Sequence, residues 1–243
     1  MQYARLGDTG LIARHLEANP EAITTTVSEA FFPKRDPRSG GTIYNWTLGT
    51  GKSAPVVASD YQHPDAFAML MERATEEMQL AVWCELGDAA QVSTLLSRDP
   101  RLAERLTDAE LRKLPDAARD GNSLAVTLML SAGWPVDTPG QHGATALHWA
   151  AWNGDAELTR ALLRHAPPLE VTDRDHSGTP LGWAIYGSVH GWRCRTGDYP
   201  AVVEVLLNSG ARAPQVTPAL QASAPVRQVL EKWISGNRAS TSS

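Results

Sequence analysis

Apolar residues recur at helical spacing in short segments along most of the chain, and a glycine followed by a polar residue separates the segments of each pair. These breaks stand at Gly87-Asp88, Gly121-Asn122 and Gly154-Asp155, about 33 residues apart. On both sides of each break, as in residues 80–96, apolar positions lie three or four residues apart, as on one face of a helix. The pattern predicts pairs of short antiparallel helices that repeat along the chain.

The clearest copy of this unit runs from Gly143 to Asp155 and reads Gly-Ala-Thr-Ala-Leu-His-Trp-Ala-Ala-Trp-Asn-Gly-Asp, with the second helix expected over residues 156–163. This copy resembles the ankyrin repeat. The resemblance implies a turn and two short helices in each unit, which must stack on neighbouring units to bury their apolar faces. It is specific for the fold, whereas for function it indicates only a scaffold.

We therefore predict an all-α, ankyrin-type helix-turn-helix solenoid of about six repeats including caps. It is expected to be one domain over residues 1–234, followed by a disordered tail over residues 235–243, which are small and polar. Two insertions interrupt the period, at about residues 20–50 and at residues 186–196. In the first, the alternation over residues 43–47 indicates a short hairpin. Insertions in solenoids often gather on the binding face.

Composition removes several classes of function from consideration. The 243-residue chain has a formal net charge of -5, and no long Lys/Arg block offers a site for nucleic acid. Gly51-Lys52-Ser53 lacks the earlier glycine of a phosphate-binding loop, because Trp46 stands there. The start of the chain does not resemble a signal peptide, and no segment is long and apolar enough to span a membrane. We expect a cytoplasmic protein without membrane or nucleic-acid partners, with Cys84 and Cys194 as reduced thiols.

Aromatic residues give the sharpest indication of a binding site. On the first helix of the clearest repeat, Trp149 and Trp152 share the face opposite the partner helix. Trp183 and Tyr186 occupy the equivalent positions one repeat later, so stacking should set Trp149 beside Trp183 and Trp152 beside Tyr186. The resemblance places this face along the concave groove of an ankyrin solenoid. Packing between repeats is the alternative role for each tryptophan, and the sequence leaves it open.

The leading hypothesis is a non-catalytic binding scaffold that takes a protein or peptide in this aromatic groove, with a small-molecule ligand as the second choice. Charged residues of the preceding repeat, the turn tips and the second insertion complete the expected site. The predicted binding residues are Asp116, Arg119, Gln141, His142, Trp149, Trp152, Asn153, Asp175, His176, Trp183, Tyr186, His190 and Trp192.

The alternative is an enzyme or small-molecule binder in which the two insertions close a pocket over the groove. Its acid–base residues would be His142, His176, His190 and Asp198. The histidines show no i, i+4 pair and no Cys-x-x-Cys accompanies them, so we expect no metal site and no cofactor. By the resemblance, His148 has a structural role, in which it ties neighbouring turns together through hydrogen bonds.

Overall fold

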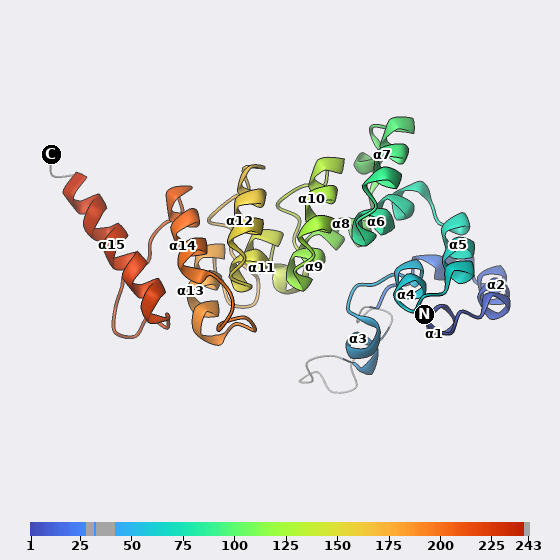
Figure 1. Cartoon of the computed structure of the whole chain (residues 1–243), viewed down its shortest axis with the longest axis horizontal. Helices are drawn as coiled ribbons and strands as arrows, with labels where there is room; N and C mark the ends of the chain where they lie inside the picture. Colours follow the sequence, from blue (N-terminus) through green and yellow to red (C-terminus); the bar gives the residue numbers. More distant parts are fainter. Residues whose placement is uncertain (28–31, 33–41, 241–243) are drawn as a thin grey trace. The chain divides into compact units, whose positions relative to one another are not determined.

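The computed structural model describes residues 1–27, 32 and 42–240, and it divides into two compact units, residues 1–113 and residues 114–243 (Figure 1). Regular structure in the described residues consists of helices, with one isolated β-bridge between Thr26 and Ser53. The all-helical prediction is therefore confirmed. The expected tail lies partly outside the described residues, at positions 241–243, as does much of the first insertion, at positions 28–31 and 33–41.

Unit 1 consists largely of short helix pairs. In chain order its elements are α1 (Gln2–Leu6), α2 (Thr9–Ala18), the 3-10 helix η1 (Pro20–Thr24), α3 (Ile43–Leu48), α4 (Ala54–Asp60), α5 (Pro64–Arg73), α6 (Glu76–Leu86), α7 (Ala89–Arg98), η2 (Leu102–Arg105) and α8 (Asp108–Leu111). The predicted break at Gly87-Asp88 separates α6 from α7, where Gly87 adopts a left-handed conformation and Asp88 caps α7. The helix-pair interpretation thus holds for this unit.

The hairpin predicted in the first insertion is wrong, because residues 43–48 form helix α3. Five alternating residues are too few to distinguish a strand from one turn of helix. Extended pairing occurs instead between two other segments. The amide of Val27 donates to the Lys52 carbonyl at 2.9 Å, and the amide of Gly51 donates to the Val27 carbonyl at 2.8 Å.

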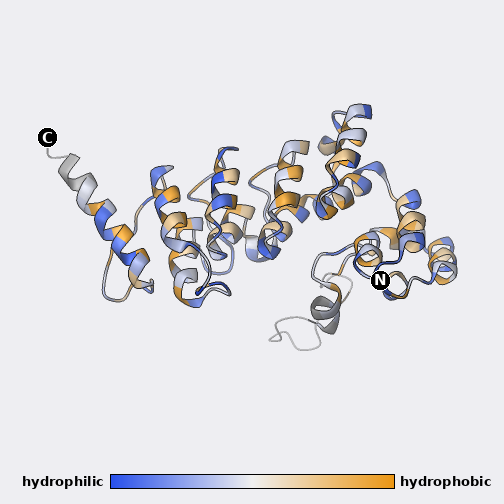
Figure 2. Ribbon diagram, viewed as in Figure 1, coloured by the Kyte–Doolittle hydropathy of each residue, from blue (hydrophilic) through white to orange (hydrophobic). Residues whose placement is uncertain are grey.

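Unit 2 contains three helix pairs followed by a single longer helix, stacked in chain order (Figure 1). The pairs are α9 (Lys113–Asp120) with α10 (Ser123–Ala132), α11 (Ala146–Trp152) with α12 (Ala156–Leu163), and α13 (Pro180–His190) with α14 (Tyr199–Asn208); η3 (Gln141–Gly143) precedes α11 and α15 (Ala224–Ser240) ends the unit. We call α9, α11 and α13 the inner helices. Hydrophobic residues of the pairs lie mainly where helices face one another (Figure 2), and Leu147, Leu158 and Leu162 are buried there.

The second helix of each pair in unit 2 begins in the same way. The side chains of Asn122, Asp155 and Asp198 accept hydrogen bonds from the amide three residues further on, which satisfies a free donor in the first turn. The polar residue that follows each turn glycine is therefore a helix cap. This local chemistry explains why the period was visible in the sequence.

The C-terminal cap of unit 2, which consists of the segment from Thr217 and helix α15, differs from the preceding pairs. Thr179-Pro180 starts α13, but the similar Thr217-Pro218 starts no helix, and the next helix begins at Ala224. Pro225 explains the difference, because a helix begun at Pro218 would carry a second proline in its interior. Helix α15 then continues to Ser240, into the segment expected to be a disordered tail.

Candidate functional site

The inner helices α11 and α13 bring the predicted aromatic residues together. The rings of Trp149 and Trp183 lie 5.0 Å apart at 89°, and those of Trp152 and Tyr186 lie 6.3 Å apart at 24°. Both expected neighbour pairs are therefore observed. With Trp192, these residues form what we call the aromatic cluster.

Trp192 covers part of this cluster. Its ring stacks on Trp149 at 5.8 Å and 21°, and it meets Trp152 edge-on at 6.1 Å. Trp192 is 66% exposed, whereas Trp149 is only 4% exposed. The expectation that Trp149 faces an open groove is therefore wrong, because the turn of residues 191–198 folds back over it. The predicted start of the second insertion is also wrong, since residues 186–190 belong to helix α13. Sequence reasoning placed Trp192 near the groove but gave no indication of this covering contact.

The covering segment is the turn of residues 191–198, which joins α13 to α14. Its end is held on the neighbouring repeat, because the amide of Asp198 donates to the Gly154 carbonyl at 2.8 Å. Nearby, the Tyr199 hydroxyl donates to the Trp152 carbonyl at 2.7 Å. A Cβ atom on Gly197 would lie 2.7 Å from the Asn153 carbonyl oxygen, so glycine is required for this approach. The turn is thus fitted against the end of α11.

Asn153 was predicted to contact a ligand, but the structure buries it. Its side-chain amide donates to the carbonyls of Ala118 and Arg119 at 3.1 and 3.0 Å. These bonds tie the end of α11 to the end of α9. Asn153 is therefore a link between repeats, and its side chain is 2% exposed.

The charged end of the predicted site lies on α9. Arg119 forms ion pairs with Asp116 and Asp120, both at 2.8 Å, and donates to Gln141 at 3.4 Å. Burial by itself lowers the pKa of Arg119, but the attraction of Asp116, and then of Asp120, outweighs it and raises the pKa. The guanidinium charge is therefore matched within its own repeat.

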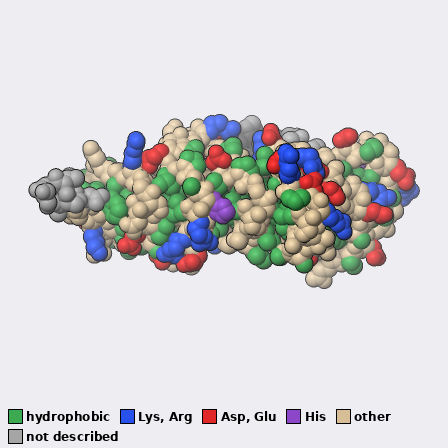
Figure 3. Space-filling model, turned by 90° about the horizontal axis from the view of Figure 1, so that it is seen from above, with side chains coloured by type: hydrophobic (Ala, Val, Ile, Leu, Met, Phe, Trp, Pro, Cys, Tyr) green, Lys and Arg blue, Asp and Glu red, His purple; other side chains and the backbone are tan. Residues whose placement is uncertain are grey.

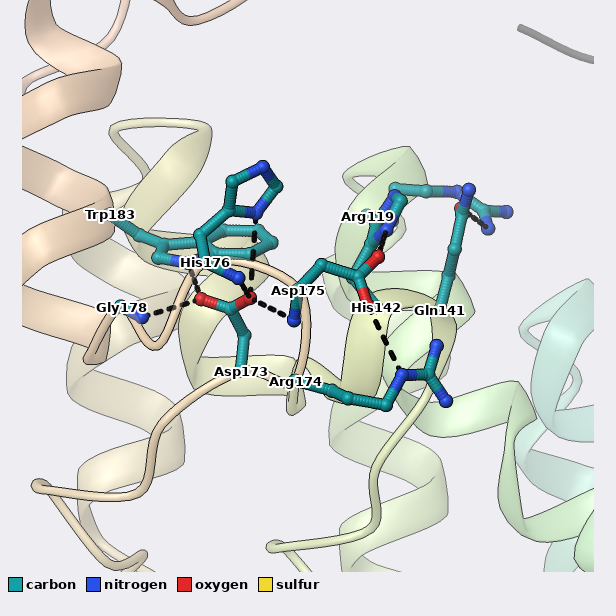
Figure 4. Close-up of polar contacts among 9 residues, drawn as sticks. All are labelled: Arg119, Gln141, His142, Asp173, Arg174, Asp175, His176, Gly178 and Trp183. Atoms are coloured by element: carbon teal, nitrogen blue, oxygen red, sulfur yellow. Dashed lines mark hydrogen bonds and ion pairs between the residues drawn. The ribbon is translucent and has the colours of Figure 1, made fainter. Parts of the chain in front are cut away.

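The tips of neighbouring turns meet beside the aromatic cluster (Figure 4). His142 Nδ1 lies 2.6 Å from Asp175 Oδ2, and its ring is 6.3 Å from Trp149 and 6.5 Å from His176. The hydrogen bond with His142 is the main reason that the pKa of Asp175 is lowered, with a further contribution from Arg174. His142, Asp175 and His176 thus form a polar edge to the cluster.

A residue missed by the sequence reasoning, Asp173, organises one of these turns. It is buried, and it accepts hydrogen bonds from the amides of Asp175, His176 and Gly178 and from Trp183 Nε1 at 2.9 Å. Burial raises the pKa of Asp173, but these hydrogen bonds outweigh it and lower the pKa to about 2. A polar residue a few positions before a turn glycine was the only available signal.

His148 connects two turns, as the resemblance implied. The Thr145 amide donates to Nδ1 at 3.1 Å, so Nε2 carries the proton and donates to the Gly178 carbonyl at 3.1 Å. Burial lowers the pKa of His148, and the hydrogen bond to Gly178 opposes this effect. The predicted structural role of this histidine is confirmed.

The four residues of the alternative catalytic hypothesis occupy two places. His142 and His176 lie at the turn tips, where the side chain of His142 is 37% exposed and that of His176 is 76% exposed. His190 Nε2 instead donates to Gln221 at 2.9 Å, and Asp198 accepts the Ala201 amide at 3.1 Å as a helix cap. Across residues 1–27, 32 and 42–240, no group of three His, Cys, Asp or Glu side chains is suited to hold a metal ion.

An open pocket of about 470 Å³ lies between α13 and the segment that precedes α15. Its lining is mostly apolar and consists of Gly182, Ile185, Tyr186, Pro214, Ala219, Leu220 and Gln221. Tyr186 belongs to both the pocket and the aromatic cluster, and it is 48% exposed. The pocket exists because the cap lacks an inner helix that would pack against α13.

The two cysteines are free and differ in accessibility. Cys84 is buried in α6, and burial raises the pKa of its thiol to about 12. Cys194 is exposed in the turn that carries Trp192.

On the face drawn in Figure 3, basic and acidic side chains lie interspersed. None of the helices in the described part of the chain is long and apolar enough to cross a membrane.

The stacked helix pairs, the capped turns and the histidine link between turns define a repeat scaffold of the ankyrin class. Residues 114–217 match the family model of ankyrin repeats in three copies. This part of the chain therefore consists of ankyrin repeats, a class that generally mediates interactions between proteins.

Among curated proteins, the chain is similar to Palmitoyltransferase Hip14 of Drosophila melanogaster, with 28% identity over 124 residues, which are 51% of this chain and 18% of that protein. It is also similar to the Probable E3 ubiquitin-protein ligase XBOS31 of Oryza sativa subsp. japonica, with 32% identity over 115 residues, or 47% of this chain and 26% of the relative. The matches thus span about a quarter or less of the length of these relatives. The similarity extends to a small part of each relative.

Proposed function

We propose that unit 2 is a non-catalytic binding scaffold and that its inner-helix face docks a peptide segment of a protein partner. One observation carries the proposal. Tyr186 and Val189 are exposed large apolar residues on a single helix, α13. An exposed apolar patch beside a pocket is typical of a recognition surface.

The pocket next to Tyr186 supports the same assignment. Its mostly apolar lining suits an aliphatic or aromatic side chain of the partner, and the His190–Gln221 hydrogen bond supplies a polar edge. The buried ion pairs of Arg119 are internal to the repeat, so charge on α9 serves the scaffold rather than the partner. We also propose that the chain forms one continuous solenoid of about six repeats. A cytoplasmic location is part of the proposal, since free cysteines are usual in a reducing compartment.

The test is capture of partners from cells of the source organism, with quantitative mass spectrometry of the bound proteins. Tyr186→Ala should weaken retention of the specific partner about tenfold or more, as loss of a central aromatic anchor does. The matched control is Leu124→Ala, since Leu124 is also an exposed apolar residue of unit 2 but lies on α10. If partners captured by the wild type were retained equally by Tyr186→Ala, the proposed docking face would be wrong.

A second candidate function, an acid–base enzyme, is favoured by the His142–Asp175 pair, since a carboxylate that binds an imidazole can orient it as a general base. The partial exposure of both side chains weighs against it, because water reaches the pair. Incubation with a metabolite extract tests this candidate. Product formation that His142→Gln abolishes while binding survives would replace the scaffold hypothesis.

A further inference from the structure

Trp192 occupies an unusual position for an exposed side chain. It is 66% exposed, yet its ring stacks at 21° on Trp149, which is almost fully buried. An exposed aromatic ring that packs on a buried one adds contact area without entering the core. Such a ring can be replaced by another aromatic ring without unfolding the repeat, because the helices beneath it are held by their own contacts.

Trp149 and Trp152, the two tryptophans that Trp192 contacts, lack hydrogen bonds at their indole nitrogens. In the described residues, the buried Nε1 atoms of Trp149 and Trp152 have no hydrogen-bond acceptor. The third indole of the cluster differs, because Trp183 Nε1 donates to Asp173 at 2.9 Å. Buried donors in folded proteins nearly always have an acceptor, so a group whose oxygen atoms reached these two N–H groups would be stabilised there.

The turn that carries Trp192 also has a definite charge. Arg193 and Arg195 stand on either side of Cys194 in this turn, and both are exposed. The helix caps Asp155 and Asp198 already bind backbone amides, and Asp116 and Asp120 pair with Arg119. These four aspartates already have partners within the chain, so the positive charge of the turn is suited to carboxylates of a binding partner.

From these observations we propose that Trp192 occupies the place of an aromatic side chain of the partner. A peptide with one aromatic residue flanked by acidic residues would displace Trp192, stack on Trp149 and offer carbonyl oxygens to the indole N–H groups of Trp149 and Trp152. This inference rests on the proposed function and specifies the chemistry of the partner segment. Its site, at Trp149 and Trp152, adjoins the pocket through Tyr186, which stacks on Trp152, but neither tryptophan lines the pocket.

The test uses three synthetic tripeptides, acetylated and amidated at their ends, with the sequences Asp-Trp-Asp, Asp-Leu-Asp and Lys-Trp-Lys. Calorimetric affinities are measured for the wild type and for Trp192→Ala. If Trp192 competes with the peptide, its removal should raise the affinity for Asp-Trp-Asp about tenfold, because the site is then always open. The other two peptides should bind about tenfold more weakly than Asp-Trp-Asp.

The indole N–H signals give a direct readout of the site. In ¹H–¹⁵N spectra, the Nε1 resonances of Trp149 and Trp152 should shift on addition of Asp-Trp-Asp, while that of Trp183 should move least because Asp173 already binds it. Trp192→Leu keeps an apolar cover and serves as a second variant if Trp192→Ala melts early. Leu124→Ala, at the exposed site on α10, should leave all affinities unchanged.

Each other result overturns the inference. If Trp192→Ala weakens binding of Asp-Trp-Asp, then Trp192 is itself part of the docking surface, and the scaffold proposal still stands through Tyr186. Equal affinity for Asp-Trp-Asp and Lys-Trp-Lys would refute the acidic specificity. Absence of binding by all three peptides, with partner capture still dependent on Tyr186, would place the recognition site at the pocket alone.

Discussion

The connections within two neighbouring helix pairs differ greatly in length but end in the same way. Between α11 and α12 the chain turns through Asn153 and Gly154, whereas between α13 and α14 it uses residues 191–198. Both connections end in an aspartate that caps the second helix, Asp155 in one pair and Asp198 in the other. The inserted residues thus leave the repeat frame intact.

What differs is the use of the extra chain. The short connection only reverses direction, while the long one folds back over the preceding repeat and places Trp192 on Trp149. An insertion at a point where the backbone is already solvent-exposed can therefore change a surface without altering the stack.

The largest loss of stability is expected where the long connection covers the preceding repeat, at Trp149. Trp149→Ala should reduce the free energy of unfolding by about 3 to 5 kcal/mol, because it removes a buried ring and leaves a cavity. Trp192→Ala should cost about 1 kcal/mol or less, since that ring is mostly exposed. Urea unfolding of both variants measures the contrast. Equal losses would show that the covering turn is an integral part of the core.

The next effect concerns the turn before α13. Asp173→Asn should cost about 2 to 3 kcal/mol near neutral pH, because a buried carboxylate with four donors loses its charge. The pKa of Asp173 is lowered to about 2 from an unfolded value of 3.8. Its contribution is therefore fully present above about pH 4 and is lost as the pH falls toward 2.

Chemical denaturation between pH 2 and pH 6 measures this dependence. The wild type should lose stability over the lower part of that range, and the difference between wild type and Asp173→Asn should shrink there. A difference that stays constant from pH 6 to pH 2 would contradict the role given to the carboxylate charge.

Two glycines of the α13–α14 region should respond in opposite directions. Gly197→Ala should destabilise by about 1 to 3 kcal/mol, because its Cβ would lie 2.7 Å from the Asn153 carbonyl oxygen. Gly182 lies within helix α13, where an added Cβ would lie 3.5 Å from Thr179 Oγ1, so Gly182→Ala should stabilise the protein by about 0.5 to 1 kcal/mol. Thermal melting of both variants gives the signs directly. If Gly197→Ala left the melting temperature unchanged, the turn would not approach the end of α11 closely.

The smallest effects should be the most alike. Asp155→Ala and Asp198→Ala each remove a helix cap, and each should cost about 1 kcal/mol. Similar losses in urea unfolding would support equivalence of the two second helices despite their different connections. A much larger loss for Asp198→Ala would show that the cap also holds the long turn in place.

The sequence was most informative where structure is local and repeated. Turn glycines and caps recur at each break, so the helix pairs and the adjacency of Trp149 with Trp183 followed from the period. The fold-back of residues 191–198 did not follow, because it depends on contacts with another repeat such as the Tyr199–Trp152 hydrogen bond. The sequence pattern also did not predict helix α3, because five alternating residues fit a strand as well as a helix. It did not predict that the cap lacks an inner helix, because a Thr-Pro pair does not always begin a helix.

The contrast between the two thiols makes the covering turn experimentally accessible. The thiolate is the reactive form, and at pH 7 to 8 the buried Cys84, with a pKa of about 12, supplies almost none of it. A maleimide dye should therefore attach to exposed Cys194, two positions from Trp192. Quenching of the dye by neighbouring indoles would then report the movement of the turn in an otherwise wild-type protein, without replacing any of the tryptophans.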